Sequence, residues 1–267
     1  MSIFISPACI LNPMDLPLAK PPWTKLGRRL ESMTRKALYE HHMLDGVSKV
    51  ALALSGGKDS LTLLFLLKAI SGRGFPELEI TAIHVTGEFS CGAGVDLPFL
   101  KAICYQMEVP LLIRESTQKR EGLACYSCSR ERRRLIFDAA KEVGATTIAF
   151  GHHREDHIQT LLMNLLHKGE FAGNLAKLEM IEYGVTLIRP LILISEEQIR
   201  IFAREHGFHR ITCQCPVGAN SMRKKVDKLL YELEALFPNA RSNLAQAGFL
   251  YGSEKARKNP QKTYADH

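Results

Sequence analysis

The sequence lacks the features that mark membrane or secreted proteins. Across its 267 residues, no stretch reaches the roughly 18 uninterrupted apolar residues expected of a membrane-spanning helix. Residues 1–23 are apolar but interrupted by prolines, and no basic segment precedes the apolar part. We therefore expect an irregular N-terminal arm rather than a signal peptide, and a cytoplasmic protein that is not bound to a membrane.

The cysteines do not form the pattern of a disulfide framework. There are seven, an odd number, in a long chain without a signal peptide. Three of them stand alone, whereas Cys125 with Cys128 and Cys213 with Cys215 form two close pairs. Close pairs in a reducing compartment typically bind a metal or carry out redox chemistry, so these four are the informative cysteines.

Acidic residues are fewer than basic ones, 28 against 35, which gives a net charge of +7. If the basic clusters lie beside one another, they favour a polyanionic partner such as a nucleic acid; if not, each is a solvated helix face. The clusters are Lys25, Arg28, Arg29, Arg35 and Lys36; Arg130, Arg132, Arg133 and Arg134; Arg223, Lys224, Lys225 and Lys228; and Lys255, Arg257, Lys258 and Lys262.

Apolar periodicity, without any internal repeat, predicts alternating strands and helices. The predicted strands are 49–54, 79–86, 109–116, 145–150 and 186–191. The predicted helices are 26–44, 60–70, 95–107, 130–144, 154–169 and 194–206. This alternation is typical of βαβ units, so we expect an α/β fold with a doubly wound, mostly parallel sheet.

The same pattern divides the chain into four predicted segments. Residues 1–44 form an N-terminal arm and helix, and residues 45–208 form the α/β domain. Residues 209–252 combine a cysteine-containing loop with a basic helical extension, and residues 253–267 form a polar tail.

The segment SGGKDS, residues 55–60, follows the first predicted strand and opens a helix. It lacks the Walker A pattern, which needs four residues between its glycines. Two glycines allow a tight turn and a close approach of backbone N–H groups to an anion, and the helix N-terminus favours negative charge. The alternative is a plain Gly-Gly turn. The candidate phosphate-binding residues are Ser55, Gly56, Gly57, Lys58 and Ser60, with Asp59 orienting the loop or holding Mg²⁺.

This hexapeptide, in its strand–turn–helix context, resembles the signature of the PP-loop ATPases, which have an adenine-nucleotide alpha-hydrolase-like fold. The resemblance implies that ATP is cleaved between its α and β phosphates. Members adenylate a carbonyl oxygen, and a nucleophile then displaces AMP. Pyrophosphate would therefore leave, rather than a γ-phosphoryl group being transferred.

The order CYSCSRERRRL, GHHREDHIQT, LIRPL and CQCPVGAN resembles the tRNA 2-thiocytidine synthetase (TtcA-like) family from about Leu26 to Gly252. The resemblance implies a [4Fe–4S] cluster held by Cys125, Cys128 and Cys215, with Cys213 outside the cluster. Three thiolates leave one iron open to carry a sulfide. Three other readings stay open: a Cys₄ zinc site, a persulfide on Cys125 or Cys128, and a purely structural CxxC.

The GHHRED segment, residues 151–156, follows the fourth predicted strand. The family usually reads HHRDD, so Glu155 stands where an aspartate is usual and Asp156 is kept. The resemblance implies that Asp156 is the catalytic acidic residue, which orients the nucleophile or binds Mg²⁺, and that Gly151 contacts the nucleotide. His152 and His153 are expected to shape the loop or contact phosphate, with metal binding as the alternative.

By the same resemblance, Arg132 faces ATP and the cluster, whereas Arg133 and Arg134 are expected to contact tRNA or solvent. The implied reaction adenylates O2 of a cytidine in the tRNA anticodon loop and replaces this oxygen with sulfur. The expected cofactors are ATP, Mg²⁺ and the [4Fe–4S] cluster.

The expected partners are tRNA and a cysteine desulfurase or other sulfur donor, and a homodimer stays open. Two alternatives remain: a 2-thiouridine-forming thiolase with the same site, and a non-catalytic nucleotide-binding protein.

Overall fold

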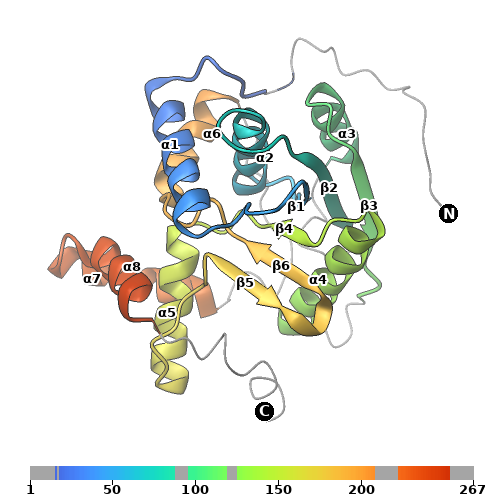
Figure 1. The fold of residues 1–267 in the computed structure, drawn as a ribbon. Helices are drawn as coiled ribbons and strands as arrows, with labels where there is room; N and C mark the ends of the chain where they lie inside the picture. Colours follow the sequence, from blue (N-terminus) through green and yellow to red (C-terminus); the bar gives the residue numbers. More distant parts are fainter. Residues whose placement is uncertain (1–15, 17, 88–95, 119–124, 208–221, 253–267) are drawn as a thin grey trace.

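The computed structural model describes residue 16 and residues 18–87, 96–118, 125–207 and 222–252. Within these residues one sheet of six strands has the order β3-β2-β1-β4-β6-β5 (Figure 1). Only β5 is antiparallel to its neighbour. The strands are β1 (Lys49–Ala53), β2 (Glu79–Thr86), β3 (Leu111–Glu115), β4 (Thr147–Ala149), β5 (Lys177–Met180) and β6 (Val185–Ile188).

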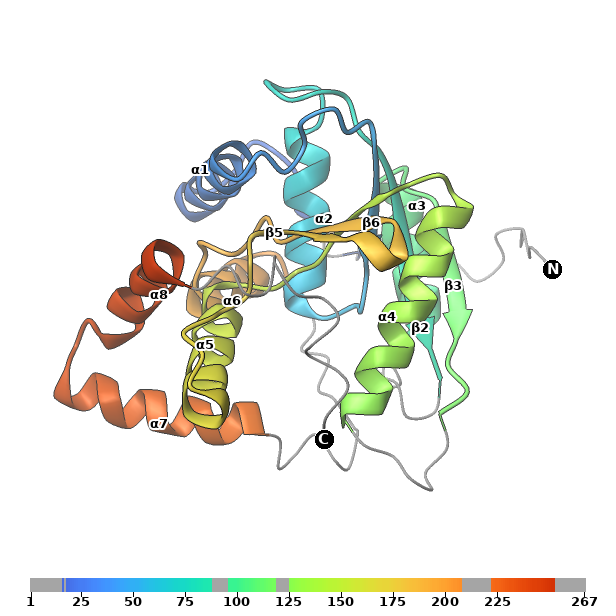
Figure 2. The same ribbon diagram turned by 60° about the horizontal axis from the view of Figure 1, so that its bottom comes forward.

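Helices cover both faces of this sheet (Figures 1 and 2). They are α1 (Lys25–Glu40), α2 (Lys58–Ile70), α3 (Leu97–Gln106), α4 (Cys125–Glu142), α5 (Arg154–Lys168), α6 (Glu196–Glu205), α7 (Met222–Leu236) and α8 (Ala240–Tyr251). The predicted doubly wound α/β fold is confirmed. No helix among the described residues is long and apolar enough to cross a membrane.

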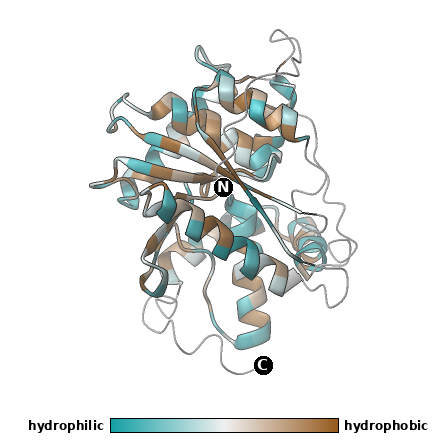
Figure 3. Ribbon diagram, turned by 90° about the vertical axis from the view of Figure 1, so that its right-hand side faces the viewer, coloured by the Kyte–Doolittle hydropathy of each residue, from teal (hydrophilic) through white to brown (hydrophobic). Residues whose placement is uncertain are grey.

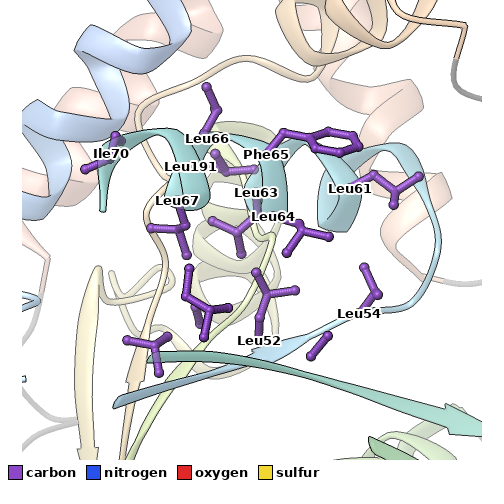
Figure 4. Packing of buried hydrophobic residues seen from close by; sticks show 14 of the residues in the cluster. Leu52, Leu54, Leu61, Leu63, Leu64, Phe65, Leu66, Leu67, Ile70 and Leu191 are labelled. Carbon is purple, nitrogen blue, oxygen red and sulfur yellow. The ribbon is translucent and has the colours of Figure 1, made fainter. Parts of the chain in front are cut away.

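The central strand β1 explains why the sheet is buried on both sides. Its side chains alternate: Val50 and Leu52 belong to the apolar cluster under α2, whereas Ala51 belongs to the cluster under α4. Helix α2 is buried on nearly every side because it lies between the sheet and the outer helices α1 and α6 (Figure 4). Figure 3 shows the matching pattern, with apolar strands inside and helices of mixed polarity around them.

The C-terminal extension is a pair of helices packed on α5. Ile158 and Leu162 of α5 share an apolar cluster with Val226 and Leu230 of α7. Helix α8 approaches α5 closely because Gly248 lies against the His157 ring, where a larger side chain would collide. The site side chains on α5 and α7 are therefore held by one packed unit.

Two sequence predictions differ from the structure. Helix α4 begins at Cys125 rather than at residue 130, so the CxxC lies on its first turn. Strand β5 was not predicted, because a short edge strand reading KLEM has little β-branched character. The predicted basic helical extension contains two helices, α7 and α8. The four segment boundaries stay a prediction.

Candidate active site

The site lies where the winding of the sheet reverses. β1 pairs in parallel with β2 on one side and with β4 on the other, and β4 continues to β6. The segments that follow β1, β4 and β6 therefore leave the same edge of the sheet next to one another. Open α/β sheets bind ligands at such a switch point, beyond the carboxyl ends of the strands.

The loop after β1 presents backbone to this edge. Gly56 has φ of +82°, a left-handed conformation that other residues adopt only with strain. Gly57 is the N-cap of α2, and no side chain caps that end. The Ser60 hydroxyl donates to the Gly57 carbonyl at 3.0 Å and lies 3.2 Å from the Ser55 hydroxyl. The helix thus offers uncapped N–H groups and its positive end to an anion.

Lys58, on the first turn of α2, is held by two carboxylates. Its Nζ lies 2.9 Å from Asp59 Oδ1 and 3.1 Å from Glu196 Oε1. Burial would lower the pKa of Lys58, but these two carboxylates outweigh it and raise the pKa. Lys58 is therefore a firmly charged group. Glu196, at the start of α6, was not a candidate from the sequence, because nothing local links it to residue 58.

Gly151, after β4, lies directly against the phosphate-loop helix. A Cβ at this position would come 3.0 Å from the Asp59 carbonyl carbon and 3.1 Å from the Ser60 nitrogen. Both atoms are backbone, which cannot move without shifting α2. Gly151 therefore sets the spacing between the two loops, and its predicted contact with the nucleotide stays a prediction.

His153 joins the two loops. Its Nε2 lies 3.8 Å from Asp59 Oδ1 and 3.5 Å from Asp156 Oδ2, and its Nδ1 lies 3.4 Å from Glu155 Oε2. Burial would lower the pKa of His153, yet the surrounding carboxylates raise it to about 8. The imidazolium therefore holds together three acidic residues from two loops, as a loop-shaping residue does.

Asp156, the predicted catalytic acidic residue, lies on the first turn of α5, and each of its two oxygens accepts a hydrogen bond from a different partner. Oδ2 accepts from the His153 backbone N–H at 3.0 Å, and Oδ1 accepts from Arg223 Nη1 of α7 at 2.8 Å. Burial would raise the pKa of Asp156, but His153 and Arg223 lower it. The carboxylate is thus ionised and fixed in direction, as binding Mg²⁺ or orienting a nucleophile requires.

Glu155, the next residue to Asp156, contacts His153 and also binds the start of α6. Its Oε2 accepts from the Glu196 backbone N–H at 2.7 Å, and Oε1 accepts from Arg154 at 2.8 Å. Burial would raise the pKa of Glu155, but His153 and Arg154 lower it to about 2. Glu155 thus anchors the start of α6, from which the Glu196 side chain reaches Lys58.

His152 and Arg189 form the far side of the site. Arg189, just after β6, donates from Nε to His152 Nδ1 at 3.3 Å and from Nη1 to the Leu175 carbonyl. Burial and Arg189 lower the pKa of His152 to about 3, so this ring is neutral and differs from its neighbour His153. The sequence predictions missed Arg189, although it lies inside the LIRPL segment.

The structure describes only part of the predicted sulfur site. Cys125 lies in the first helical turn of α4, and Cys128, one turn later on the same face, is buried. Cys213 and Cys215 lie outside the described residues. Arg132 is half-buried on α4, one turn after Cys128, whereas Arg133 is exposed.

Comparisons with known proteins identify the family of this chain. Residues 24–212 match the model of the PP-loop domain family. A curated tRNA-cytidine(32) 2-sulfurtransferase of Anaeromyxobacter dehalogenans is 32% identical, covering 84% of this chain and 79% of that protein. The protein of the same name from Cupriavidus necator is 33% identical, covering 84% and 73%.

Among solved structures, the U34-tRNA thiolase NcsA of Methanococcus maripaludis, determined with its [4Fe–4S] cluster, superimposes with a TM-score of 0.68 at 22% identity. The match covers 84% of this chain and 78% of the thiolase, which establishes a shared fold. The chain described here therefore belongs to the PP-loop family and, within it, to the tRNA-cytidine 2-sulfurtransferase family of enzymes.

Proposed function

We propose that this protein uses ATP to replace O2 of a cytidine in the anticodon loop of tRNA with sulfur. One observation carries the proposal: His153 joins the uncapped start of α2, beside Lys58, to the ionised Asp156. An anion-binding helix end and an oriented carboxylate at one switch point suit an adenylation reaction. Family membership supports the nature of the substrate.

The phosphate loop has the groups needed to bind the leaving pyrophosphate of ATP. The backbone N–H groups after Gly56 and Gly57 would contact phosphate oxygens, with the Ser55 and Ser60 hydroxyls beside them. Phosphate would compete with Asp59 and Glu196 for Lys58, whose raised pKa keeps it charged. The cytidine O2 then forms a bond to the α-phosphorus, and the bond from this phosphorus to pyrophosphate breaks.

Asp156 would act next to the α-phosphate. Its lowered pKa keeps it ionised at neutral pH, and the fixed positions of its two oxygens suit it to hold Mg²⁺ or to orient the attacking group. Asp59, which shares His153 with Asp156, is the second carboxylate available to the ion. Bound Mg²⁺ would neutralise charge that develops on the departing pyrophosphate.

The second half of the reaction needs a sulfur source. We assign Cys125, Cys128 and Cys215 as ligands of a [4Fe–4S] cluster, which when bound supplies the sulfur that displaces AMP together with the former O2. The position of Cys125 and Cys128 one helical turn apart in α4 supports this assignment. Arg132, one turn further, would neutralise the thiolates and the nucleotide phosphate.

The RNA requirements follow from the chemistry. A cytidine inside a duplex cannot reach a site at the edge of a sheet, so an unstacked base in a loop is the better substrate. A cysteine desulfurase or other sulfur donor would replenish the sulfur, and a homodimer is compatible with this scheme.

The experiment that tests the function is a nucleoside analysis. Protein purified without oxygen, incubated with ATP, Mg²⁺, sulfide and a tRNA transcript, should yield 2-thiocytidine by mass spectrometry. The same analysis on tRNA from a deletion strain should show that 2-thiocytidine is missing. 2-Thiouridine in place of 2-thiocytidine in the transcript would change the base assignment. No thionucleoside in the transcript, together with an unchanged 2-thiocytidine content in the deletion strain, would overturn the proposal.

The cysteine assignment has a separate test. Cys125→Ala, Cys128→Ala and Cys215→Ala should each lose iron and thiolation together, since each removes one of three ligands, and Cys213→Ala should keep most of its iron. Colourless protein with about one zinc, dependent on Cys213, would favour a Cys₄ site. Full activity of Cys215→Ala without iron would favour a persulfide.

A further inference from the structure

Near Asp156 and next to His152 lies a buried arginine with a donor that no described residue engages. Arg189 is 7% exposed, and its Nε and Nη1 donate to His152 and to the Leu175 carbonyl. In the described part of the chain, Nη2 has no hydrogen-bond partner, and no carboxylate oxygen lies within 4 Å of this guanidinium. The cost of burying an arginine in this way suggests that a ligand completes its coordination.

Arg223 reaches the same place from α7. Its Nη1 donates to Asp156 Oδ1 at 2.8 Å, and its side chain stays 43% exposed. The other guanidinium nitrogens of Arg223 have no hydrogen-bond partner among the residues that the structure describes. Arg223 therefore pairs directly with Asp156, whereas Arg189 interacts with this carboxylate only through its charge at longer range, and both arginines keep donors available.

The local charge favours an anion. Burial and the positive charges of Arg133 and Arg223 together lower the pKa of Arg189 to about 10, against the opposing effect of Asp156. His152, neutral at physiological pH, supplies no compensating charge. Arg133 of α4 thus belongs to the electrostatic surroundings of this arginine pair.

We propose that Arg189 and Arg223, with Arg133 beside them, form a subsite for a backbone phosphate of the RNA strand next to the reactive base. This inference rests on the proposed function. RNA is favoured over ATP by position, because the nucleotide loop faces Asp156 Oδ2 through His153, whereas Arg223 binds Oδ1. A planar guanidinium is well suited to binding phosphate oxygens through two donors.

The neighbouring residues indicate the path of the strand. Arg223 begins a basic run with Lys224, Lys225 and Lys228 on α7, and Arg133 lies between Arg132 and Arg134 on α4. In Figure 2 the first turns of α4 and α7 lie at the same end of the molecule. A phosphate bound here would take over Arg223 from Asp156 and release Oδ1 when RNA is present.

The test combines variants with neutralised phosphates. An RNA stem-loop that contains the reactive cytidine is made with single methylphosphonates at each phosphate flanking that base, and binding is measured with wild type and with Arg223→Gln. One methylphosphonate should weaken wild-type binding about tenfold, the worth of one charged hydrogen bond. The same methylphosphonate should have almost no further effect on Arg223→Gln.

Arg133→Gln should reduce the methylphosphonate effect less than Arg223→Gln does. Arg189→Lys, which keeps the buried charge, should reduce this effect only in part. Arg204→Gln, an exposed arginine on α6, is the matched control and should leave the methylphosphonate effect unchanged.

Two results would overturn the subsite: equal methylphosphonate effects in wild type and Arg223→Gln at every position, or a raised KM for ATP in Arg223→Gln with unchanged RNA affinity. The second result would assign the arginines to the nucleotide. Failure of the proposed function looks different, because wild type would then bind no stem-loop at all.

Discussion

The loops that follow β1 and β4 meet at one edge of the sheet but are built in opposite ways. The first uses backbone: a left-handed Gly56 and an uncapped helix start at Gly57. The second uses side chains, whose partners come from α2, α6 and α7. A backbone site is fixed by a few neighbouring residues, whereas a side-chain site depends on the packing of distant elements.

The largest expected effect comes from removing the cation of the backbone loop. Lys58→Ala should lower ATP-dependent thiolation about 10²- to 10³-fold, because a fixed charge on the departing pyrophosphate is lost. The melting temperature should change little, since Lys58 is partly exposed and paired only with groups of the site. Lys68→Ala, on the last turn of the same helix, is the control. Equal losses of stability and activity would mean that Lys58 is structural.

Glu155 tests whether the second loop depends on distant partners. Its folded pKa of about 2 lies below the ordinary 4.5, so its stabilisation is fully present above pH 4.5 and is lost as the pH falls toward 2. A shift of this size corresponds to on the order of 3 kcal/mol. Glu155→Gln should lower stability at pH 7 by up to that amount and flatten the acid limb of a denaturation profile.

Glu155→Asp separates the effect of side-chain length at this position from the effect of charge. The shorter side chain keeps the charge next to His153 but should lose the hydrogen bond to the Glu196 N–H, and with it part of the ATP affinity. Unchanged ATP affinity in Glu155→Asp would show that the start of α6 does not need this anchor.

Replacing His153 should have a smaller effect on stability, with the opposite dependence on pH. Its pKa is raised from 6.5 to about 8, so its stabilisation is fully present below pH 6.5 and is lost as the pH rises through 8. This pKa shift corresponds to about 2 kcal/mol of folding free energy. Stability of wild type, measured by urea unfolding between pH 6 and 9, should fall over this window, and His153→Gln should remove the dependence. A slope that persists in His153→Gln would assign the titration elsewhere.

The smallest effect concerns Gly56. Gly56→Ala should cost about 1 kcal/mol of stability, because alanine is strained in the left-handed region. Gly46, with φ of +70° and open space around it, is the matched control. Both alanine variants should lose similar stability by thermal unfolding, but only Gly56→Ala should weaken ATP binding in calorimetry. Equal ATP affinities would show that the loop tolerates a side chain.

Much of the fold could be predicted from the sequence, because a parallel sheet buried on both faces leaves apolar runs such as KVALAL that need no tertiary information to recognise. The unpredicted parts are those with weak local signals. The edge strand β5 is short and half polar, and the first turn of α4 carries a cysteine pair whose spacing suggests a metal site more readily than a helix.

The sequence by itself determined the family and was enough to predict the phosphate loop and the nature of the chemistry, because the contacts expected of Gly56, Gly57 and Lys58 come from their own backbone and immediate neighbours. Only the tertiary structure shows that Glu196 pairs with Lys58, that Arg223 pairs with Asp156 and that Arg189 donates to His152. Charges of this kind interact over a few ångströms in space, whatever their separation along the chain. Their partners are therefore set by the order β1-β4-β6 and by the docking of α7 on α5.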